Sequence, residues 1–169
     1  LHALESYLGS GESVAGRVVL SAVPCGNPDG LTSGAAPGNG VGGSPETGYP
    51  PEANFFDDAT DPEARYLWRW ACFEGPDLLL EVRSGDAVRW EASDPGSALA
   101  LALGADSLGP PGCLAAAMAT GTPNGLGAIP GLRLTSPAGE MNTALDRLWS
   151  ALGREGVLSP SPARTALDA

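Results

Sequence analysis

Apolar positions recur along the chain with two different periods, which predict alternating helices and strands. Stretches whose apolar residues lie three and four apart are typical of amphipathic helices. They are 1–9, 61–74 and 139–153. Short apolar runs bounded by Gly, Pro or charged residues are typical of buried strands. They are 16–24 and 78–83. The first half therefore predicts two successive helix-to-strand steps.

The helix at 61–74 has the clearest end signals. Thr60 or Asp61 can cap it, Pro62 suits its first position, and Glu63 lies in the first turn. Farther on, 84–138 is rich in Ala, Gly and Pro, and its pattern indicates only a short helix at 113–120 and a strand at 129–135. Another helix is expected to begin within 159–169 and to be cut short by the chain end.

Alternating helices and strands predict the α/β class, with a mostly parallel central sheet flanked by helices. At 169 residues the chain is expected to form a single, partial domain over 1–169. Between 26 and 58 the sequence is dense in Gly, Pro, Asn and Ser, so 31–58 should be the least regular segment of the first half.

The composition excludes several classes of partner. A formal net charge of −11 argues against nucleic-acid or anionic-membrane binding, because both need a basic surface. No apolar run approaches the roughly 20 residues that span a bilayer, so we expect a soluble protein. The pattern of cysteines favours a reducing, cytoplasmic location, with a periplasmic location left open. All nine basic residues are Arg, which is typical of a GC-rich bacterial genome.

The three cysteines, Cys25, Cys72 and Cys113, are an odd number and lie more than forty residues apart. This spacing suggests neither a disulfide framework nor zinc ligation by paired cysteines. We expect three buried free thiols.

Alternation along 77–83 places Leu79, Glu81 and Arg83 on one face of a strand. Two interpretations stay open. In the first, Glu81 and Arg83 form a structural ion pair that satisfies two partly buried charges. In the second, the Arg83 guanidinium binds the carboxylate of a ligand through two hydrogen bonds, since ligands of α/β sheets bind beyond the carboxyl ends of strands.

Two segments together resemble the zinc metallocarboxypeptidase family and its desuccinylase and aspartoacylase relatives. They are VVLSAVPCGNPDG (18–30) and PDLLLEVRSGD (76–86). The order of elements agrees with the family over 1–86. The resemblance implies a carboxypeptidase-like fold, a turn at 27–30 beside the active site, and substrate-binding roles for Asn27, Asp29, Glu81 and Arg83. It also implies that Leu78, Leu80 and Val82 lie buried in a central strand beside 17–23.

The resemblance implies a zinc-dependent hydrolase, part of a metallopeptidase that releases a C-terminal residue or cleaves an acyl-amide. Its ligand would be a small peptide or acylated amino acid. Arg83 stands where the family has a zinc-binding His, and His2 with Glu5 matches the family's first motif in spacing alone, so zinc is not expected to bind this chain by itself. The alternative is a non-catalytic domain that binds a peptide or carboxylate on the same scaffold.

Overall fold

A computed structural model describes residues 5, 14, 18–36, 38–49, 60–109, 112–121, 125, 127–154 and 156–169. Its centre is a four-stranded sheet in the order β1-β4-β2-β3. The strands are β1 (Leu79–Ser84), β2 (Arg89–Ala92), β3 (Asp106–Ser107) and β4 (Gly131–Ser136). β1 with β4 and β2 with β3 are parallel pairs, whereas β4 with β2 is antiparallel. The α/β class and the mostly parallel sheet are confirmed.

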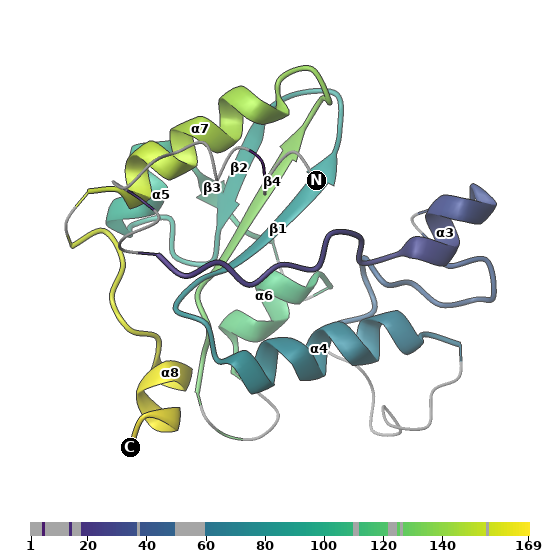
Figure 1. Ribbon diagram of the computed structural model, residues 1–169, viewed down its shortest axis with the longest axis horizontal. Coiled ribbons are helices and arrows are strands. Elements are labelled where there is room, and N and C mark those ends of the chain that lie inside the picture. The colour runs from purple at the N-terminus through teal and green to yellow at the C-terminus, as the bar shows by residue number, and fades with distance from the viewer. Residues whose placement is uncertain are drawn as a thin grey trace.

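Helices cover both faces of this sheet (Figure 1). The described helices are α3 (Pro28–Ser33), α4 (Pro62–Glu74), α5 (Ala98–Leu103), α6 (Leu114–Ala119), α7 (Met141–Leu152) and α8 (Pro162–Leu167). α5 and α7 enclose one apolar cluster with the inward side chains of β2 and β4. α4 and α6 enclose a second cluster on the opposite face, to which α8 adds Ala163.

The prediction for 61–74 is confirmed almost to the residue. The Asp61 side chain accepts a hydrogen bond from the Ala64 amide, and Pro62 opens α4. Gly75 ends the helix in the left-handed conformation that glycine adopts without strain. The predictions for 113–120, 129–135 and 139–153 are confirmed as α6, β4 and α7, with shifted ends, and α8 lies inside the helix expected from 159.

The strand predicted at 16–24 is wrong for its described residues. Residues 18–24 form no strand, and Val19 is 96% exposed. Val18 and Leu20 still pack against the α7 cluster, and the Ser21 hydroxyl lies 3.4 Å from a Glu74 carboxylate oxygen at the end of α4. The segment therefore contacts α7 on one face of the sheet and α4 on the other. Because these contacts hold it outside the sheet, tertiary packing overrides its β-propensity.

The prediction for β1 is correct in extent but wrong in place. Among the described residues β1 pairs only with β4, so it is an edge strand. Leu79 is the buried residue, Leu78 and Leu80 are half-buried, and Val82 is 41% exposed. The reason is that β4, rather than the 18–24 segment, is the strand that pairs with β1 in the described part of the chain, and an edge strand buries less of either face.

Several elements were not predicted. β2, α5 and β3 fall inside the Ala-, Gly- and Pro-rich 84–138 region, where β2 has only four residues and α5 only six. Ser97 caps α5 and Gly104 ends it, and these two end signals were readable in the sequence. The helix predicted at 1–9 lies outside the described residues, apart from Glu5.

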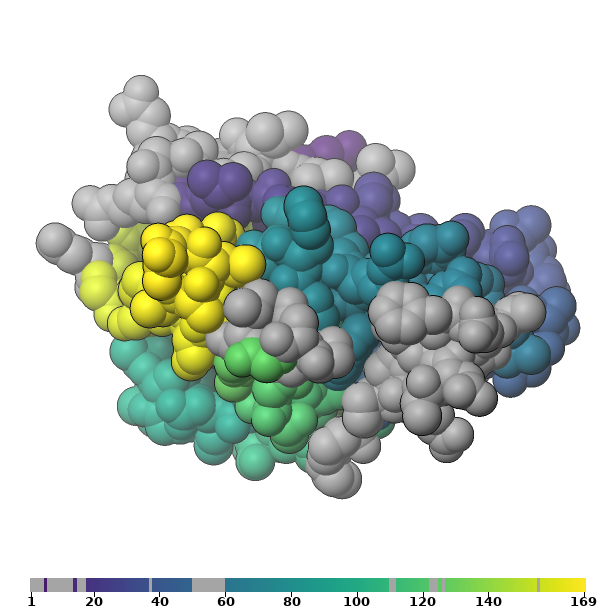
Figure 2. Space-filling view, turned by 90° about the horizontal axis from the view of Figure 1, so that it is seen from below, coloured from purple at the N-terminus to yellow at the C-terminus, as the bar shows by residue number. Residues whose placement is uncertain are grey.

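The long segment after Cys25 is irregular only in part. α3 covers Pro28–Ser33, so the prediction of irregular structure from 31 is wrong at its start. Residues 34–36 and 38–49 contain no helix or strand, as expected, and 50–59 lie outside the described residues. Figure 2 shows α8 (yellow) toward the left of the view and the blue segment that begins with α3 at its right end.

Within the described ranges, no helix combines the length and the apolar character that a membrane crossing requires.

Candidate functional site

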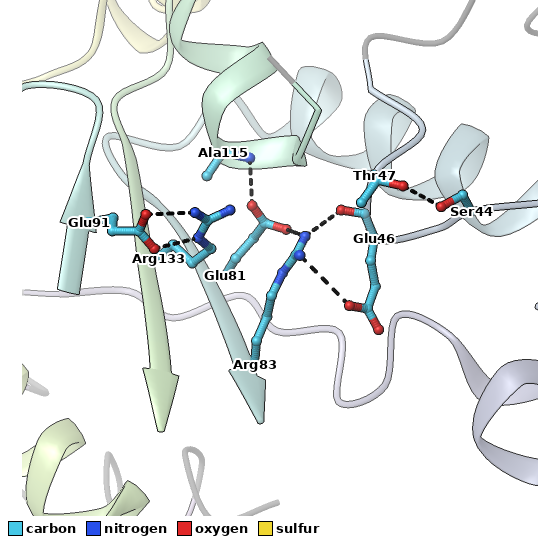
Figure 3. A network of polar contacts seen from close by, with 8 residues as sticks. All are labelled: Ser44, Glu46, Thr47, Glu81, Arg83, Glu91, Ala115 and Arg133. Carbon is cyan, nitrogen blue, oxygen red and sulfur yellow. Dashed lines mark hydrogen bonds and ion pairs between the residues drawn. The ribbon is translucent and has the colours of Figure 1, made fainter. Parts of the chain in front are cut away.

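A row of alternating charges crosses the sheet on the face beneath α6 (Figure 3). The register places Arg133 of β4 opposite Glu91 of β2 on one side and opposite Glu81 of β1 on the other. Arg83, two residues farther along β1, has its side chain on the same face. We call these four residues, together with Glu46, the charge row.

The Arg133–Glu91 pair is the best-formed contact in the charge row. Arg133 Nε donates to Glu91 Oε2 at 2.9 Å, and its Nη2 donates to Oε1 at 2.8 Å, which is the two-pronged geometry that suits guanidinium and carboxylate. The Arg133 hydrogen bond lowers the pKa of Glu91, which outweighs the opposing effect of burial. Only 13% of the Glu91 side chain is exposed, so this pair is largely shielded from water.

Both carboxylate oxygens of Glu81 have a hydrogen-bond partner. Its Oε2 accepts a hydrogen bond from the Ala115 amide in the first turn of α6 at 2.9 Å, and its Oε1 accepts one from Arg83 Nη2 at 3.1 Å. The predicted Glu81–Arg83 pair is therefore present. Because Glu81 also ties β1 to α6, its contacts fit the structural interpretation.

Arg83 makes further contacts on its outer side. Its Nη2 donates to the backbone carbonyl of Glu46, and its Nη1 lies 3.7 Å from Glu46 Oε2. The Arg83 side chain is 21% exposed and that of Glu46 is 36% exposed. The guanidinium thus lies between two carboxylates, one inner and well covered, the other outer and open to water.

Glu46 reaches Arg83 from a short turn, residues 44–49, which we call the Glu46 turn. The Ser44 amide donates to Asp61 Oδ2 at 2.8 Å, which fixes the start of the turn to the cap of α4. The Thr47 and Gly48 amides both donate to the Ser44 carbonyl, and the Ser44 and Thr47 hydroxyls bond each other. Sequence reasoning missed Glu46, although Pro45 is a turn signal.

Tyr49 closes the Glu46 turn. Its ring stacks on Trp68 of α4, with the centroids 6.1 Å apart and the planes 19° from parallel. The residue is only 4% exposed, yet its hydroxyl has no hydrogen-bond partner in the described part of the chain. Burial is the main cause that raises the pKa of Tyr49, and the negative charge of Glu81 is the second. The hydroxyl therefore keeps its proton and can act as a hydrogen-bond donor.

Asn27 and Asp29 lie at the start of α3, and their substrate-binding roles stay predictions. Asn27 caps α3, because its Oδ1 accepts from the Gly30 amide at 2.9 Å, and its Nδ2 donates to the Gly38 carbonyl at 3.2 Å. Asp29 is exposed in the first turn of α3. The Asn-Pro-Asp-Gly turn was therefore a wrong prediction, since Asn before Pro and Asp opens a helix equally well. Both residues belong to the start of α3, whereas Glu81 and Arg83 lie on β1.

The cysteines match the expectation at two of three positions. Cys72 and Cys113 are buried free thiols, and burial raises the pKa of Cys72 to about 11. Burial also raises the pKa of Cys113, and the nearby Glu81 carboxylate adds to this effect. Cys25 is exposed, contrary to expectation, because the segment that carries it runs over the surface instead of entering the sheet.

The described residues do not fit a zinc ion. Among them, no group of three His, Cys, Asp or Glu side chains is placed to hold a metal. Arg83, which the family resemblance would align with a metal-binding His, carries a permanent positive charge that would repel Zn²⁺. His2 lies outside the described residues, and Glu5 is exposed.

The charge row should make folding stability depend on pH. Arg133 lowers the pKa of Glu91 in the folded state, so the stabilisation is present above the unfolded pKa of about 4.3 and is lost as pH falls through the lowered folded value. We expect wild type to exceed Glu91→Gln in unfolding free energy at pH 7, and this difference to shrink toward pH 3. Urea unfolding of both proteins at several pH values measures it. A difference that stays constant from pH 7 to 3 would contradict the assignment.

No protein-family model, curated protein or solved structure matches the chain. The charge row must therefore be interpreted from its own chemistry. That chemistry combines an arginine near a strand's carboxyl end, a solvent-accessible carboxylate partner, and a buried hydroxyl that has no hydrogen-bond partner among the described residues.

Proposed function

We propose that this chain is a non-catalytic binding domain that holds the free carboxylate of a small peptide or acylated amino acid at Arg83. The observation that carries the proposal is the position of the Arg83 guanidinium, which already accommodates carboxylate oxygens on two sides. Guanidinium binds carboxylates through paired charge-assisted hydrogen bonds. Arg83 also lies near the carboxyl end of β1, the edge at which α/β sheets bind ligands.

The Tyr49 hydroxyl supports the same proposal. A buried hydroxyl without a partner costs roughly 1–3 kcal/mol, so it requires an explanation. Glu81 and Arg83 lie close enough for their charges to act on it. A ligand whose carboxylate is held by Arg83 can offer this hydroxyl an acceptor oxygen.

The zinc-dependent hydrolase implied by the family resemblance stays a prediction, as does the carboxypeptidase-like version of the fold. Its metal ligands would have to come from outside the described residues, because those described do not fit the ion. For this reason carboxylate binding is the function we place first.

Calorimetric titration with N-acetylalanylalanine, and with the same dipeptide as its C-terminal amide, tests the proposal. We expect wild type to bind the acid and not the amide, since only the acid carries the carboxylate. Arg83→Gln should weaken binding of the acid by about tenfold or more, because charge-assisted hydrogen bonds are lost.

The matched control is Arg154→Gln, which removes the same charge at an exposed position. It should bind the acid as wild type does. Equal binding of acid and amide by wild type, or equal losses in the two arginine variants, would overturn the proposal.

A further inference from the structure

Arg83 makes a closer contact with one of its two carboxylate partners than with the other. The inner partner, Glu81, has a contact of 3.1 Å, a side chain only 15% exposed, and a second anchor on the Ala115 amide. The outer partner, Glu46, lies at 3.7 Å with 36% of its side chain exposed. An incoming carboxylate therefore meets Glu46 as the weaker and more accessible competitor.

The backbone of the Glu46 turn does not depend on the Glu46 carboxylate. Ser44 is anchored to Asp61, and Tyr49 is anchored by stacking on Trp68. Between them, the Thr47 and Gly48 amides close the turn on the Ser44 carbonyl at 3.0 Å and 2.7 Å. The side chain of Glu46 can thus leave Arg83 while both ends of the turn stay in place.

From these contacts we propose that Glu46 is a built-in competitor of the ligand, an autoinhibitory contact that occupies the outer side of Arg83 until a ligand carboxylate displaces it. This inference rests on the proposed function of Arg83 and adds regulation to it. Glu46 provides the same chemical group as the ligand, but tethered to the turn, so its local concentration is high. Any process that removes its charge would open the site.

The effect of such a competitor is expected to be modest. A partly exposed ion pair of this length contributes little to stability, equivalent to a factor of about three in an equilibrium constant. The backbone carbonyl of Glu46 still accepts from Arg83 when the side chain is neutral, so part of the contact persists. We therefore expect a several-fold change in affinity.

The test is the affinity of Glu46→Gln for N-acetylalanylalanine, measured by calorimetry beside wild type. The matched control is Asp106→Asn, which removes the same charge from β3, at the sheet edge opposite β1. We expect Glu46→Gln to bind about threefold more tightly than wild type, and Asp106→Asn to bind as wild type does.

The outcomes separate the two proposals. Binding by wild type with no gain in Glu46→Gln, or an equal gain in Asp106→Asn, overturns the competitor and leaves the function of Arg83 in place. Binding by Glu46→Gln but not by wild type supports the competitor in its strongest form. Absence of binding by both proteins overturns the function and the competitor together.

Discussion

Gly131→Ala is expected to destabilise the fold strongly, by about 3 kcal/mol or more. A Cβ at Gly131 would lie 2.3 Å from the Ala115 carbonyl oxygen and 2.7 Å from its carbonyl carbon. These are backbone atoms of α6, so no side chain can rotate away. β4 cannot retreat either, because it is paired with β1 on one side and β2 on the other.

Urea unfolding followed by circular dichroism measures this loss. The matched control is Gly139→Ala, where an added Cβ meets nothing within 4 Å. That control should change the unfolding free energy by less than about 0.5 kcal/mol. If Gly131→Ala unfolds at the urea concentration of wild type, the close approach of α6 to β4 is wrong.

Arg133→Met is expected to lower the unfolding free energy by about 3 kcal/mol at pH 7. Arg133 is the shared cationic neighbour of Glu91 and Glu81 in the sheet register, and it makes both hydrogen bonds to Glu91. Without it, Glu91 is a largely shielded carboxylate with no cation hydrogen-bonded to it. The cost arises from that uncompensated charge more than from the lost attraction.

A double-mutant cycle isolates this cost. Adding Glu91→Gln to Arg133→Met removes the uncompensated charge, so the double variant should be more stable than Arg133→Met alone. Arg154→Met, at an exposed position, serves as the control and should unfold as wild type does. Strictly additive losses in the cycle would show that the two side chains are not coupled.

The sequence predicted several elements well because their end signals are local. Asp61, Pro62 and Gly75 define α4 through capping and backbone preference, which act within a few residues. In α7, inward residues at helical spacing made the helix readable without knowledge of its partners. Local signals were also the source of the wrong turn prediction at 27–30, because the tetrapeptide Asn-Pro-Asp-Gly suits both a turn and the start of a helix.

Of the candidate site, the sequence indicated the Glu81–Arg83 pair, because alternation in a strand puts residues two apart on one face. It did not indicate Glu46, Tyr49, Glu91 or Arg133 as members. Glu46 lies 37 positions from Arg83, and Glu91 lies 42 positions from Arg133. No local pattern carries such information.

What the sequence determined by itself is therefore the α/β class, most of the longer elements, and the charged face of β1, since all three depend on short-range periodicity and capping. The tertiary structure alone decided that β4 is the neighbour of β1, that residues 18–24 stay out of the sheet, and that Glu46 meets Arg83. These outcomes depend on which distant segments compete for the same sheet edge and the same guanidinium. That competition is settled by packing over the whole chain.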